Sequence, residues 1–490
     1  MHFDFDRCDF VEQDQATDAL ALSDAQRQIS WGALLEATDA WQTRALAAGV
    51  LPGHALVITG HKEIEFVVAM LGCLRLGVTY VPVDSINPPE RLKLITERVA
   101  AAKVYNATLN SFAEGAAITT PMAEPGIAYV MFTSGSTGEP KGVQIGRDSV
   151  ALFAGWIRDC LALNPHPAFM NQMLFSFDFS LFDLCGALGL GGACVLCPRE
   201  TIADPVAFVR YLADTGVQVW ASTPAFVRQQ FLNDDFNHEH LPQLGVFVFG
   251  AESLSPAMAE QLWSRFPNAR IINSYGPTEA TCSTTWVEIK RPLDGARNPL
   301  SIGRAKPYAE VFLDDGEICI AGDHVMRGYL GRPDLTAKSL FQHKGKRAYR
   351  TGDIGEIDDQ GLVYFHGRRD DQIKLNGYRI ELAEVDVGLA RLPGVVAGAA
   401  VVLRRPDGSL VRMIGFVSTP ESLEPGVIGP LPEQLHNWKE ALGERLPHYM
   451  VPSELVACGR FLTNVSDKVD RKRLEAQYRE TRMKPTKEKP

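Results

Sequence analysis

The sequence lacks the features of a secreted, membrane-spanning or nucleic-acid-binding protein. Nine cysteines in 490 residues do not form a disulfide framework, so we expect a protein of the reducing cytoplasm. The N-terminal stretch MHFDFDRCDF is acidic and lacks the basic and then apolar order of a signal peptide. No apolar run approaches the roughly 18 residues that span a bilayer, so no membrane span is expected. Acidic residues (59) outnumber basic ones (49), and the net charge of -10 argues against nonspecific nucleic-acid binding.

The composition and the pattern of apolar residues indicate a folded protein of more than one domain. The chain is 46% apolar and 22% charged, and its length exceeds what one core normally holds. Through residues 20–330, short apolar runs alternate with helical patterns, which predicts α/β layers with largely parallel sheets. We predict strands at residues 54–60, 78–84, 102–106, 126–134, 217–223, 245–250 and 269–276, and helices that include 64–77 and 205–216.

The pattern changes after about residue 300. Residues 309–322 are typical of a hairpin around an Asp-Asp-Gly turn. A small unit follows from about residue 371, and its helical pattern at 431–447 predicts a helix. The tail at 481–490 is rich in proline and lysine and is expected to be disordered.

The stretch YVMFTSGSTGEPKGV (129–143) predicts a phosphate-binding loop after a strand. It is not a Walker A loop, because Glu139 and Pro140 separate Gly138 from Lys141. Glycines let the backbone approach an anion, and successive N–H groups and hydroxyls donate to its oxygens. The candidate phosphate-binding residues are Thr133, Ser134, Gly135, Ser136, Thr137, Gly138 and Lys141. The alternative is a flexible surface loop, which an ordered run directly after a strand disfavours.

The loop resembles the phosphate-loop signature of the adenylate-forming superfamily, which includes acyl-CoA synthetases, luciferases and nonribosomal peptide adenylation domains. Further segments resemble the other signatures of that superfamily in the expected order: residues 74–92, 273–281, 316–336, 349–353, 367–386 and 467–474. Seven such motifs in order are far more specific than any one of them. Residues 175–183, 220–227 and 373–386 look most like D-alanine–carrier protein ligases, within the amino-acid-activating branch.

This resemblance covers nearly the whole chain and implies its architecture. The fold class is α/β, with a large N-terminal adenylate-forming domain of layered sheets and helices at residues 1–369. A small mobile C-terminal α+β domain occupies residues 370–480, and Asp370 matches the hinge. Two half-reactions at one site need different walls around it, which is the purpose of such a hinge.

The implied activity is that of a stand-alone amino acid–carrier protein ligase that uses ATP and Mg²⁺. The substrate carboxylate attacks the α-phosphate of ATP to give an aminoacyl-adenylate and pyrophosphate. A phosphopantetheine thiol of a carrier protein then attacks this anhydride to form a thioester. No carrier domain is visible in the sequence, so we expect the carrier protein in trans.

The resemblance assigns the nucleotide contacts residue by residue. Glu279 is the position that supports Mg²⁺, and Thr278 contacts phosphate. Asp353 binds the ribose hydroxyls with paired hydrogen bonds, as a carboxylate can. The other nucleotide-side residues come from the same motifs: Asn273, Tyr275 against the adenine, Gly276, and Arg368 and Lys374 near the ribose. A solvated loop charge is the alternative for Glu279 and Asp353 taken alone.

Two residues are implied for the two different half-reactions. Lys468 is the adenylation lysine, whose compact charge bridges the substrate carboxylate and the α-phosphate. Its alternative is an exposed, solvated lysine. Ser466-Asp467 stand where the family usually has Asn-Gly, which puts the efficiency of the first step in question. Gly377 lies where the family lines the thiol tunnel of the second step.

Asp178 decides the substrate class, because amino-acid-activating members pair this aspartate with the substrate ammonium. The alternative is a helix N-cap with Ser180 nearby. The other implied pocket positions are Phe179, Phe182, Ala221, Val248, Gly250, Ser274, Cys282 and Ser283. D-alanine ligases typically have cysteine at the position of Gly250. A pocket with so little side-chain volume admits an amino acid larger than alanine, unless Phe179 and Phe182 refill it.

Other functions and sites stay open on the sequence alone. The rival enzyme is an acyl- or aryl-CoA ligase, which Asp178 argues against. The rival from another class is a catalytically silent nucleotide-binding regulatory protein. Cell-envelope D-alanylation and natural-product assembly are alternative pathways. We interpret Cys194 and Cys197 as core residues and His238-Glu-His240 as a polar loop, rather than as metal sites.

Overall fold

The computed structural model describes residues 1–12, 17–135, 139–293, 295–375, 377–404, 410–419, 428–429, 431, 433–459, 461–462 and 469–483. The chain divides into two compact units. The first comprises Met1–Ser85, Leu94–Phe132 and Gly142–Arg369. The second comprises Ile86–Lys93, Thr133–Lys141 and the chain from Asp370 onward.

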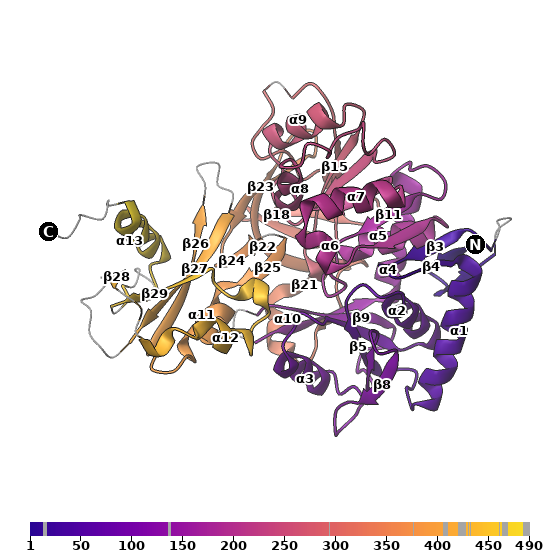
Figure 1. The fold of residues 1–490 in the computed structure, drawn as a ribbon, viewed down its shortest axis with the longest axis horizontal. Coiled ribbons are helices and arrows are strands. Elements are labelled where there is room, and N and C mark those ends of the chain that lie inside the picture. The colour runs from indigo at the N-terminus through magenta and orange to yellow at the C-terminus, as the bar shows by residue number, and fades with distance from the viewer. Residues whose placement is uncertain are drawn as a thin grey trace. The chain divides into compact units, whose positions relative to one another are not determined.

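Two large sheets form the first unit (Figure 1). The described strands of one sheet are, in spatial order, β20 (Gly328–Tyr329), β10 (Lys141–Gly146), β9 (Ile127–Thr133), β6 (Thr79–Asp84), β5 (Ala55–Gly60), β7 (Lys103–Asn106) and β8 (Ser111–Glu114). Those of the other are β17 (Arg304–Ala305), β16 (Thr285–Ile289), β15 (Arg270–Tyr275), β14 (Val246–Phe249), β13 (Val219–Ser222), β11 (Ala168–Asn171), β12 (Ala193–Leu196), β3 (Leu20–Ser23) and β4 (Gln28–Ser30). The central pairs of both sheets are parallel, as predicted.

Two smaller sheets complete the strands described for this unit. One contains β18 (Glu310–Asp314), β19 (Glu317–Ala321), β22 (Lys346–Ile357), β21 (Leu340–His343) and β23 (Val363–Arg368). The other pairs β1 (His2–Asp4) with β2 (Asp9–Val11). The predicted hairpin at 309–322 is confirmed as β18 and β19. Asp315 (φ 51°) and Gly316 (φ 74°) form its two-residue turn, which needs positive φ at both positions.

The helices of this unit are α1 (Trp31–Ala47), α2 (Ile64–Leu76), α4 (Arg147–Cys160), α5 (Ser180–Gly189), α6 (Arg199–Ala203), α7 (Pro205–Thr215), α8 (Pro224–Gln230), α9 (Pro256–Arg265) and α10 (Pro333–Ser339), with the 3₁₀ turn η1 (Thr278–Ala280). The helix α3 (Pro89–Arg98) begins in the second unit and ends in the first. Local chemistry explains why α7 begins and ends where it does. Asp204 accepts hydrogen bonds from two N–H groups of the first turn, and Pro205 follows it. Gly216 ends the helix in the left-handed conformation.

The second unit contains two described sheets and three helices. Its elements are β24 (Gln372–Leu375), β25 (Tyr378–Glu381), α11 (Leu382–Ala390), β26 (Ala397–Arg404), β27 (Leu410–Ser418), β28 (Ile428–Gly429), η2 (Glu433–Leu435), α12 (Trp438–Gly443), η3 (His448–Met450), β29 (Glu454–Cys458) and α13 (Arg471–Met483). α11 packs on β26 and β27. α13 runs to Met483 and thus includes three residues of the tail expected to be disordered.

Each predicted strand and helix of residues 54–276 is confirmed within about two residues at its ends. The exception comes later in the chain. The described residues of the range 431–447 form η2 and the six-residue α12 instead of one helix. The apolar residues of this segment, such as Leu435, Trp438 and Leu442, are nevertheless buried in the core of the second unit. The apolar spacing therefore reports burial here, and not a continuous helix.

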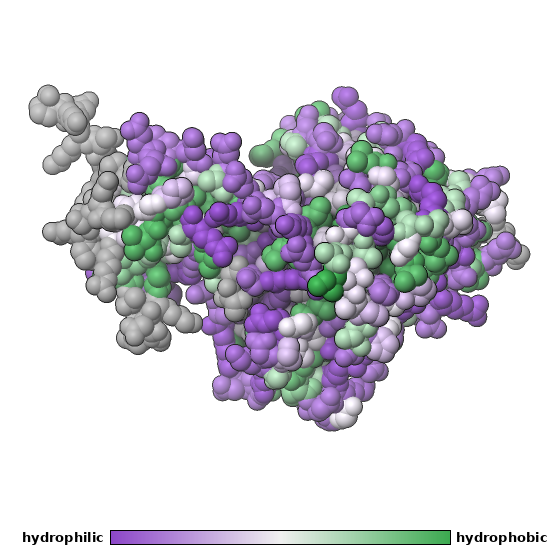
Figure 2. Space-filling model, turned by 90° about the horizontal axis from the view of Figure 1, so that it is seen from below, coloured by the Kyte–Doolittle hydropathy of each residue, from purple (hydrophilic) through white to green (hydrophobic). Residues whose placement is uncertain are grey.

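Large apolar side chains are mostly buried in the cores of the two units. The face in Figure 2 shows many hydrophilic residues, with hydrophobic residues in smaller separate patches. Exposed large apolar residues come from many parts of the chain: Leu46, Leu51, Leu109, Ile118, Val206, Leu232, Leu313 and Val396. Within the described ranges, no helix combines the length and the apolar character that crossing a bilayer requires.

Candidate active site

The carboxyl ends of three neighbouring parallel strands bring together many of the predicted site residues. Ala221 on β13 pairs with Val248 on β14, and Phe249 pairs with Asn273 on β15. Gly250 directly follows β14, and Gly276 directly follows β15. Ligands of open α/β sheets bind at this edge. Ala221 and Val248 are fully buried there.

The turn after β15 places Gly276 against the backbone of Ser283 and Thr284. A Cβ at position 276 would lie 2.5 Å from Ser283 Cα, so only glycine fits this close approach. Thr281 and Cys282 both have positive φ (53° and 65°), and the Thr284 N–H closes the turn on Tyr275 O at 2.7 Å. The backbone of this turn is thus held in one conformation.

Glu279 lies in η1, within the same turn, and is fully buried. Its Oε1 accepts a hydrogen bond from the Tyr329 hydroxyl at 2.7 Å. Its backbone carbonyl accepts from the Met326 N–H at 2.8 Å, which anchors η1. Thr278, the predicted phosphate contact, precedes Glu279 in η1 and is 8% exposed.

Asp353, Arg368 and Tyr275 form one buried polar cluster. Asp353 on β22 faces Arg368 on β23, and the Arg368 guanidinium donates to Asp353 Oδ1. The Tyr275 hydroxyl donates to Asp353 Oδ2 at 2.5 Å. Burial raises the pKa of Tyr275 well above its usual value, and the charge of Asp353 raises it further, so the phenol keeps its proton and donates it. The structure therefore fixes both oxygens of the predicted ribose-binding carboxylate.

The loop between β11 and α5 carries Asp178 and Phe179. Asp178 is half-buried, and Phe179 is 6% exposed. The pKa of the Cys282 thiol is held well above its usual value by burial and then by the charge of Asp178. The predicted ammonium-binding carboxylate thus acts electrostatically on a predicted pocket residue.

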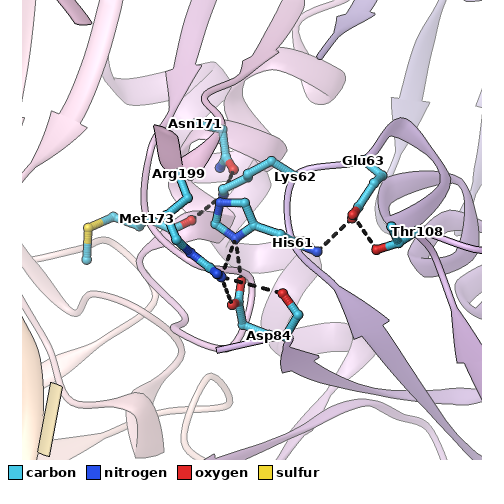
Figure 3. Close-up of polar contacts among 9 residues, drawn as sticks. His61, Lys62, Glu63, Asp84, Thr108, Asn171, Met173 and Arg199 are labelled. Carbon is cyan, nitrogen blue, oxygen red and sulfur yellow. Dashed lines mark hydrogen bonds and ion pairs between the residues drawn. The ribbon is translucent and has the colours of Figure 1, made fainter. Parts of the chain in front are cut away.

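A buried lysine that the sequence motifs did not reveal supports this loop (Figure 3). The Lys62 ammonium donates to Asn171 Oδ1 and to Met173 O. It lies 4.1 Å from the ring centroid of Phe175. Asn171 Nδ2 in turn donates to Ser180 O at 2.9 Å, at the start of α5. Lys62 therefore holds the start of the loop at Met173, and Asn171 holds its end at Ser180.

The same close-up shows a second set of polar contacts beside Lys62. His61 Nδ1 lies 2.7 Å from Asp84 Oδ2, and Arg199 donates to Asp84 Oδ1 at 2.8 Å. His61 follows β5 and Asp84 ends β6, whereas Arg199 begins α6 after β12. These contacts link the carboxyl edges of the two large sheets.

Lys306 is another buried lysine that the motifs did not reveal. Its amine donates to Ser283 O at 2.9 Å and to Ser283 Oγ at 2.6 Å. It also lies 3.3 Å from the ring centroid of Trp156. Burial lowers the pKa of Lys306 well below its usual value. A lysine in a sequence is normally expected on the surface, so only the structure shows that Lys306 is buried and holds Ser283.

The phosphate loop belongs to the second unit, where it contacts the segment that begins with β25. The Ser134 hydroxyl donates to Arg379 O at 3.0 Å and accepts from the Glu381 N–H at 2.9 Å. The Gly135 N–H donates to Glu384 Oε2 at 3.3 Å. Glu384 also pairs with Arg91 at 2.6 Å, and both side chains are buried. Two predicted phosphate donors thus have protein partners in this conformation.

The remaining predicted residues are placed as follows. Thr133 ends β9, Lys141 begins β10, Asp370 begins the last segment of the second unit, and Lys374 lies on β24. Gly377 has φ 82°, in the turn between β24 and β25. Ser136, Thr137, Gly138 and Lys468 lie outside the described residues, as do Ser466 and Asp467.

Comparisons with known proteins agree with the predicted family. The sequence profile of the family described as AMP-binding enzyme matches residues 10–115 and 101–330. The D-alanine–D-alanyl carrier protein ligase of Bacillus licheniformis is 32% identical over 489 residues, with 94% of this chain and 96% of its own chain covered. The protein of the same name from Staphylococcus epidermidis is 35% identical over 436 residues, with 86% and 88% covered.

The fold is shared with solved adenylation domains. The Vibrio cholerae adenylation domain AlmE, in complex with glycyl-adenosine-5'-phosphate, has a TM-score of 0.79 at 20% identity, with 95% of both chains covered. The matches confirm the predicted superfamily, the α/β fold and the class of ATP-dependent ligase. The chain belongs to the AMP-binding enzyme family.

Proposed function

We propose that the enzyme activates an amino acid as its adenylate and transfers it to the phosphopantetheine thiol of a carrier protein. The two relatives reported above, at 32% and 35% identity, are named D-alanine–D-alanyl carrier protein ligases. The observation that carries the proposal is the position of Asp178. Asp178 precedes Phe179 in the loop between β11 and α5, and the ring of Phe179 lies 2.9 Å from where a Cβ would be on Gly250, directly after β14. A carboxylate at such a site binds an ammonium group by a charge-assisted hydrogen bond.

The nucleotide side of the proposal rests on Asp353. Tyr275 and Arg368 hold one carboxylate oxygen each, so Asp353 presents a fixed pair of acceptors to the two ribose hydroxyls. Such preorganisation removes the cost of orienting the carboxylate when ATP binds. Lys374 is proposed to contact the ribose side, and Asn273 and Gly276 to line the adenine site with Tyr275.

Glu279 fits the role of a Mg²⁺ ligand. Mg²⁺ is usually held by one or two carboxylates together with substrate phosphates. Glu279 is a buried carboxylate oriented by Tyr329, next to the predicted phosphate contact Thr278. Bound Mg²⁺ would neutralise negative charge on the phosphates of ATP. The residues present are therefore compatible with the metal.

The two half-reactions are assigned to different residues of the second unit. Lys468 is proposed to bridge the substrate carboxylate and the α-phosphate in the first step. Gly377 is proposed to line the path of the thiol in the second, and Asp370 to act as the hinge. The contacts of Ser134 and Gly135 with residues 379–384 belong to a conformation in which these donors are not available to a phosphate.

Pyrophosphate exchange tests the proposal with an acid panel that contains amino acids, fatty acids and aryl acids. We expect exchange with an amino acid only, and we expect Asp178→Asn to lower its kcat/KM by at least thirtyfold. Loss of one partner of a buried charge pair commonly costs about 2–5 kcal/mol. Asp214→Asn, at an exposed position on α7, is the matched control. Exchange with a fatty or aryl acid, unaffected by Asp178→Asn, would support the acyl- or aryl-CoA ligase instead.

A further inference from the structure

The segment at 322–329 contacts the turn that carries Glu279 at several points. The Met326 N–H donates to Glu279 O at 2.8 Å, and the Tyr329 hydroxyl donates to Glu279 Oε1 at 2.7 Å. These two hydrogen bonds hold the backbone and the carboxylate of the same residue. The segment at 322–329 is therefore the support on which the position of Glu279 depends.

His324 lies in this segment and binds the turn at two further residues. The Thr281 hydroxyl donates to His324 O at 2.6 Å, and His324 Nε2 lies 3.2 Å from Thr284 Oγ1. Thr281 and Cys282 both have positive φ, which residues other than glycine seldom adopt, and β-branched residues least of all. Such a backbone persists only where its surroundings hold it. The contacts of His324 at positions 281 and 284 lie on the two sides of Cys282 and hold this backbone.

The buried ring of His324 is neutral, and its proton is assigned by its contacts. Burial, and to a smaller extent the charges of Lys306, Arg347 and Lys346, lowers the pKa of His324 from 6.5 to about 3. Its Nδ1 has no hydrogen-bond partner in the described part of the chain, whereas Nε2 faces Thr284 Oγ1. A buried N–H without an acceptor is rare, so the proton of the neutral ring belongs on Nε2 and is donated to Thr284.

His324 is itself held by residues outside the turn that it supports. Its ring lies edge-to-face with the ring of Tyr308, with centroids 5.1 Å apart. A Cβ at position 322 would lie 2.7 Å from His324 Nδ1, so Gly322 leaves the space that the ring needs. Arg347 on β22 donates to Asp323 O at 3.1 Å, and its own carbonyl accepts from the Gly322 N–H at 3.0 Å. His324 is thus a fixed point against which the turn is held.

We propose that His324 is a positioning residue for the metal and nucleotide site. Through Thr281 and Thr284, it holds the turn at 276–284 in the conformation that presents Glu279 to Mg²⁺. This inference rests on the proposed function, in which Glu279 supports the metal. The sequence assigned no role to His324, because its contacts reach the site only through the turn.

Asparagine and glutamine at position 324 separate the contributions of the two ring nitrogens. The amide of glutamine reaches the place of Nε2, whereas that of asparagine reaches only the place of Nδ1. His324→Gln therefore keeps a donor for Thr284, and His324→Asn loses it. Thr284→Val removes the same contact from the other side, and it carries the test if His324→Asn does not fold. His240→Asn, at a side chain that is 53% exposed, is the matched control.

The measurement is the affinity for a nonhydrolysable ATP analogue, by calorimetry, with Mg²⁺ and with EDTA. With Mg²⁺, we expect His324→Asn and Thr284→Val each to raise the Kd about tenfold, because the turn and its metal ligand are no longer held in place. With EDTA, the Kd of both variants should change by less than about threefold, since the metal no longer contributes. His324→Gln and His240→Asn should stay within about threefold of wild type in both conditions.

Two further readouts separate positioning from a general loss of structure. The double variant of His324→Asn and Thr284→Val should bind no more weakly than either single variant, because both substitutions remove one contact. In pyrophosphate exchange, the apparent KM for Mg²⁺ should rise in His324→Asn, whereas the KM for the amino acid should not. A similar loss of Mg²⁺-dependent affinity in His324→Gln and His324→Asn would overturn the inference, because it indicates a packing defect.

Glu279→Gln distinguishes failure of the inference from failure of the proposed function. We expect it to weaken the Mg²⁺-dependent affinity at least as much as His324→Asn does. If it does so while His324→Asn and Thr284→Val bind like wild type, His324 does not position the site, although the proposed function stands. If Glu279→Gln leaves the affinity unchanged, Glu279 is not the metal ligand, and the proposed metal role fails together with the inference.

Discussion

The substitution Lys62→Met isolates the contribution of the buried lysine to the substrate loop. It keeps a long side chain in place but removes the donors to Asn171 Oδ1 and Met173 O. The loop that carries Asp178 and Phe179 then loses its anchor. An unsatisfied buried acceptor costs about 1–3 kcal/mol, and if the loop relaxes instead, a similar amount is lost in amino-acid binding. We therefore expect the KM for the amino acid to rise about 10- to 100-fold.

The global stability should change much less than this loss of contacts suggests. Burial lowers the pKa of Lys62 from 10.5 to about 8, although electrostatic interactions with Cys194, Asp84 and Asp183 raise it in part. At ~1.4 kcal/mol for each pH unit, keeping this lysine charged at pH 7 costs the fold about 3 kcal/mol. Methionine removes that cost and also removes the hydrogen bonds. The two effects offset each other to within about 2 kcal/mol.

The dependence of stability on pH provides an independent check. Between about pH 8 and 10.5, Lys62 of the folded protein has released its proton whereas that of the unfolded chain retains it. The unfolded state then binds more protons, so the free energy of unfolding gains a contribution that rises with pH in this window. Lys62→Met should lack this contribution, and Lys338→Met at an exposed site on α10 should retain it.

The assay is pyrophosphate exchange with the concentrations of amino acid and ATP varied separately. The KM for ATP should change less than threefold, because the contacts of Asp353 with Tyr275 and Arg368 do not involve the loop. An amino-acid KM within threefold of wild type would show that Lys62 does not support the substrate loop. An equal rise in both KM values would contradict this role as well, since that result indicates a general defect.

Three further substitutions test other parts of the site. Asp353→Asn should raise the KM for ATP by about 10- to 100-fold with little effect on the amino-acid KM, because a charged hydrogen-bonding group contributes about 1.5–3 kcal/mol; equal effects on both would contradict the ribose role. The free energy of unfolding of Lys306→Met, relative to that of wild type, should be higher at pH 7 than at pH 10. Burial lowers the pKa of Lys306, so wild type gains stability as the pH rises, whereas the variant does not. Urea unfolding at both pH values measures this, and a pH-independent difference between the two proteins would contradict it. Lys468→Ala should abolish exchange but leave transfer from a supplied aminoacyl-adenylate largely intact, and equal loss of both steps would exclude the assignment.

The sequence predicted the parts of the fold that depend on short-range patterns. Strands such as β5 and β14 are apolar runs buried in a parallel sheet, and α7 begins after Asp204 and ends at Gly216. The same logic was wrong for residues 431–447, where apolar residues are buried without forming one helix. Periodicity indicates which residues are buried, but tertiary packing decides how the backbone between them is arranged.

Family motifs in the sequence identified several residues of the candidate site whose contacts could not be derived from the sequence. The cluster of Tyr275, Asp353 and Arg368 joins residues up to 93 positions apart, and their motifs identified them before their contacts were known. Lys62 and Lys306 were missed, because a lone lysine in a sequence is most often solvated. The sequence alone also could not show how near Phe179 lies to Gly250, where a Cβ would be 2.9 Å from the ring, because the two residues come from different loops.

Intact-mass spectrometry of the acceptor distinguishes a carrier-protein ligase from a CoA ligase. The enzyme is incubated with ATP, Mg²⁺ and glycine or an alanine, together with either a phosphopantetheinylated D-alanyl-type carrier protein or free CoA. We expect the carrier protein to gain the mass of one aminoacyl group in an ATP-dependent reaction, far faster than CoA is acylated. Acylation of CoA in preference to the carrier, or no thioester on either acceptor despite adenylate formation, would contradict this expectation.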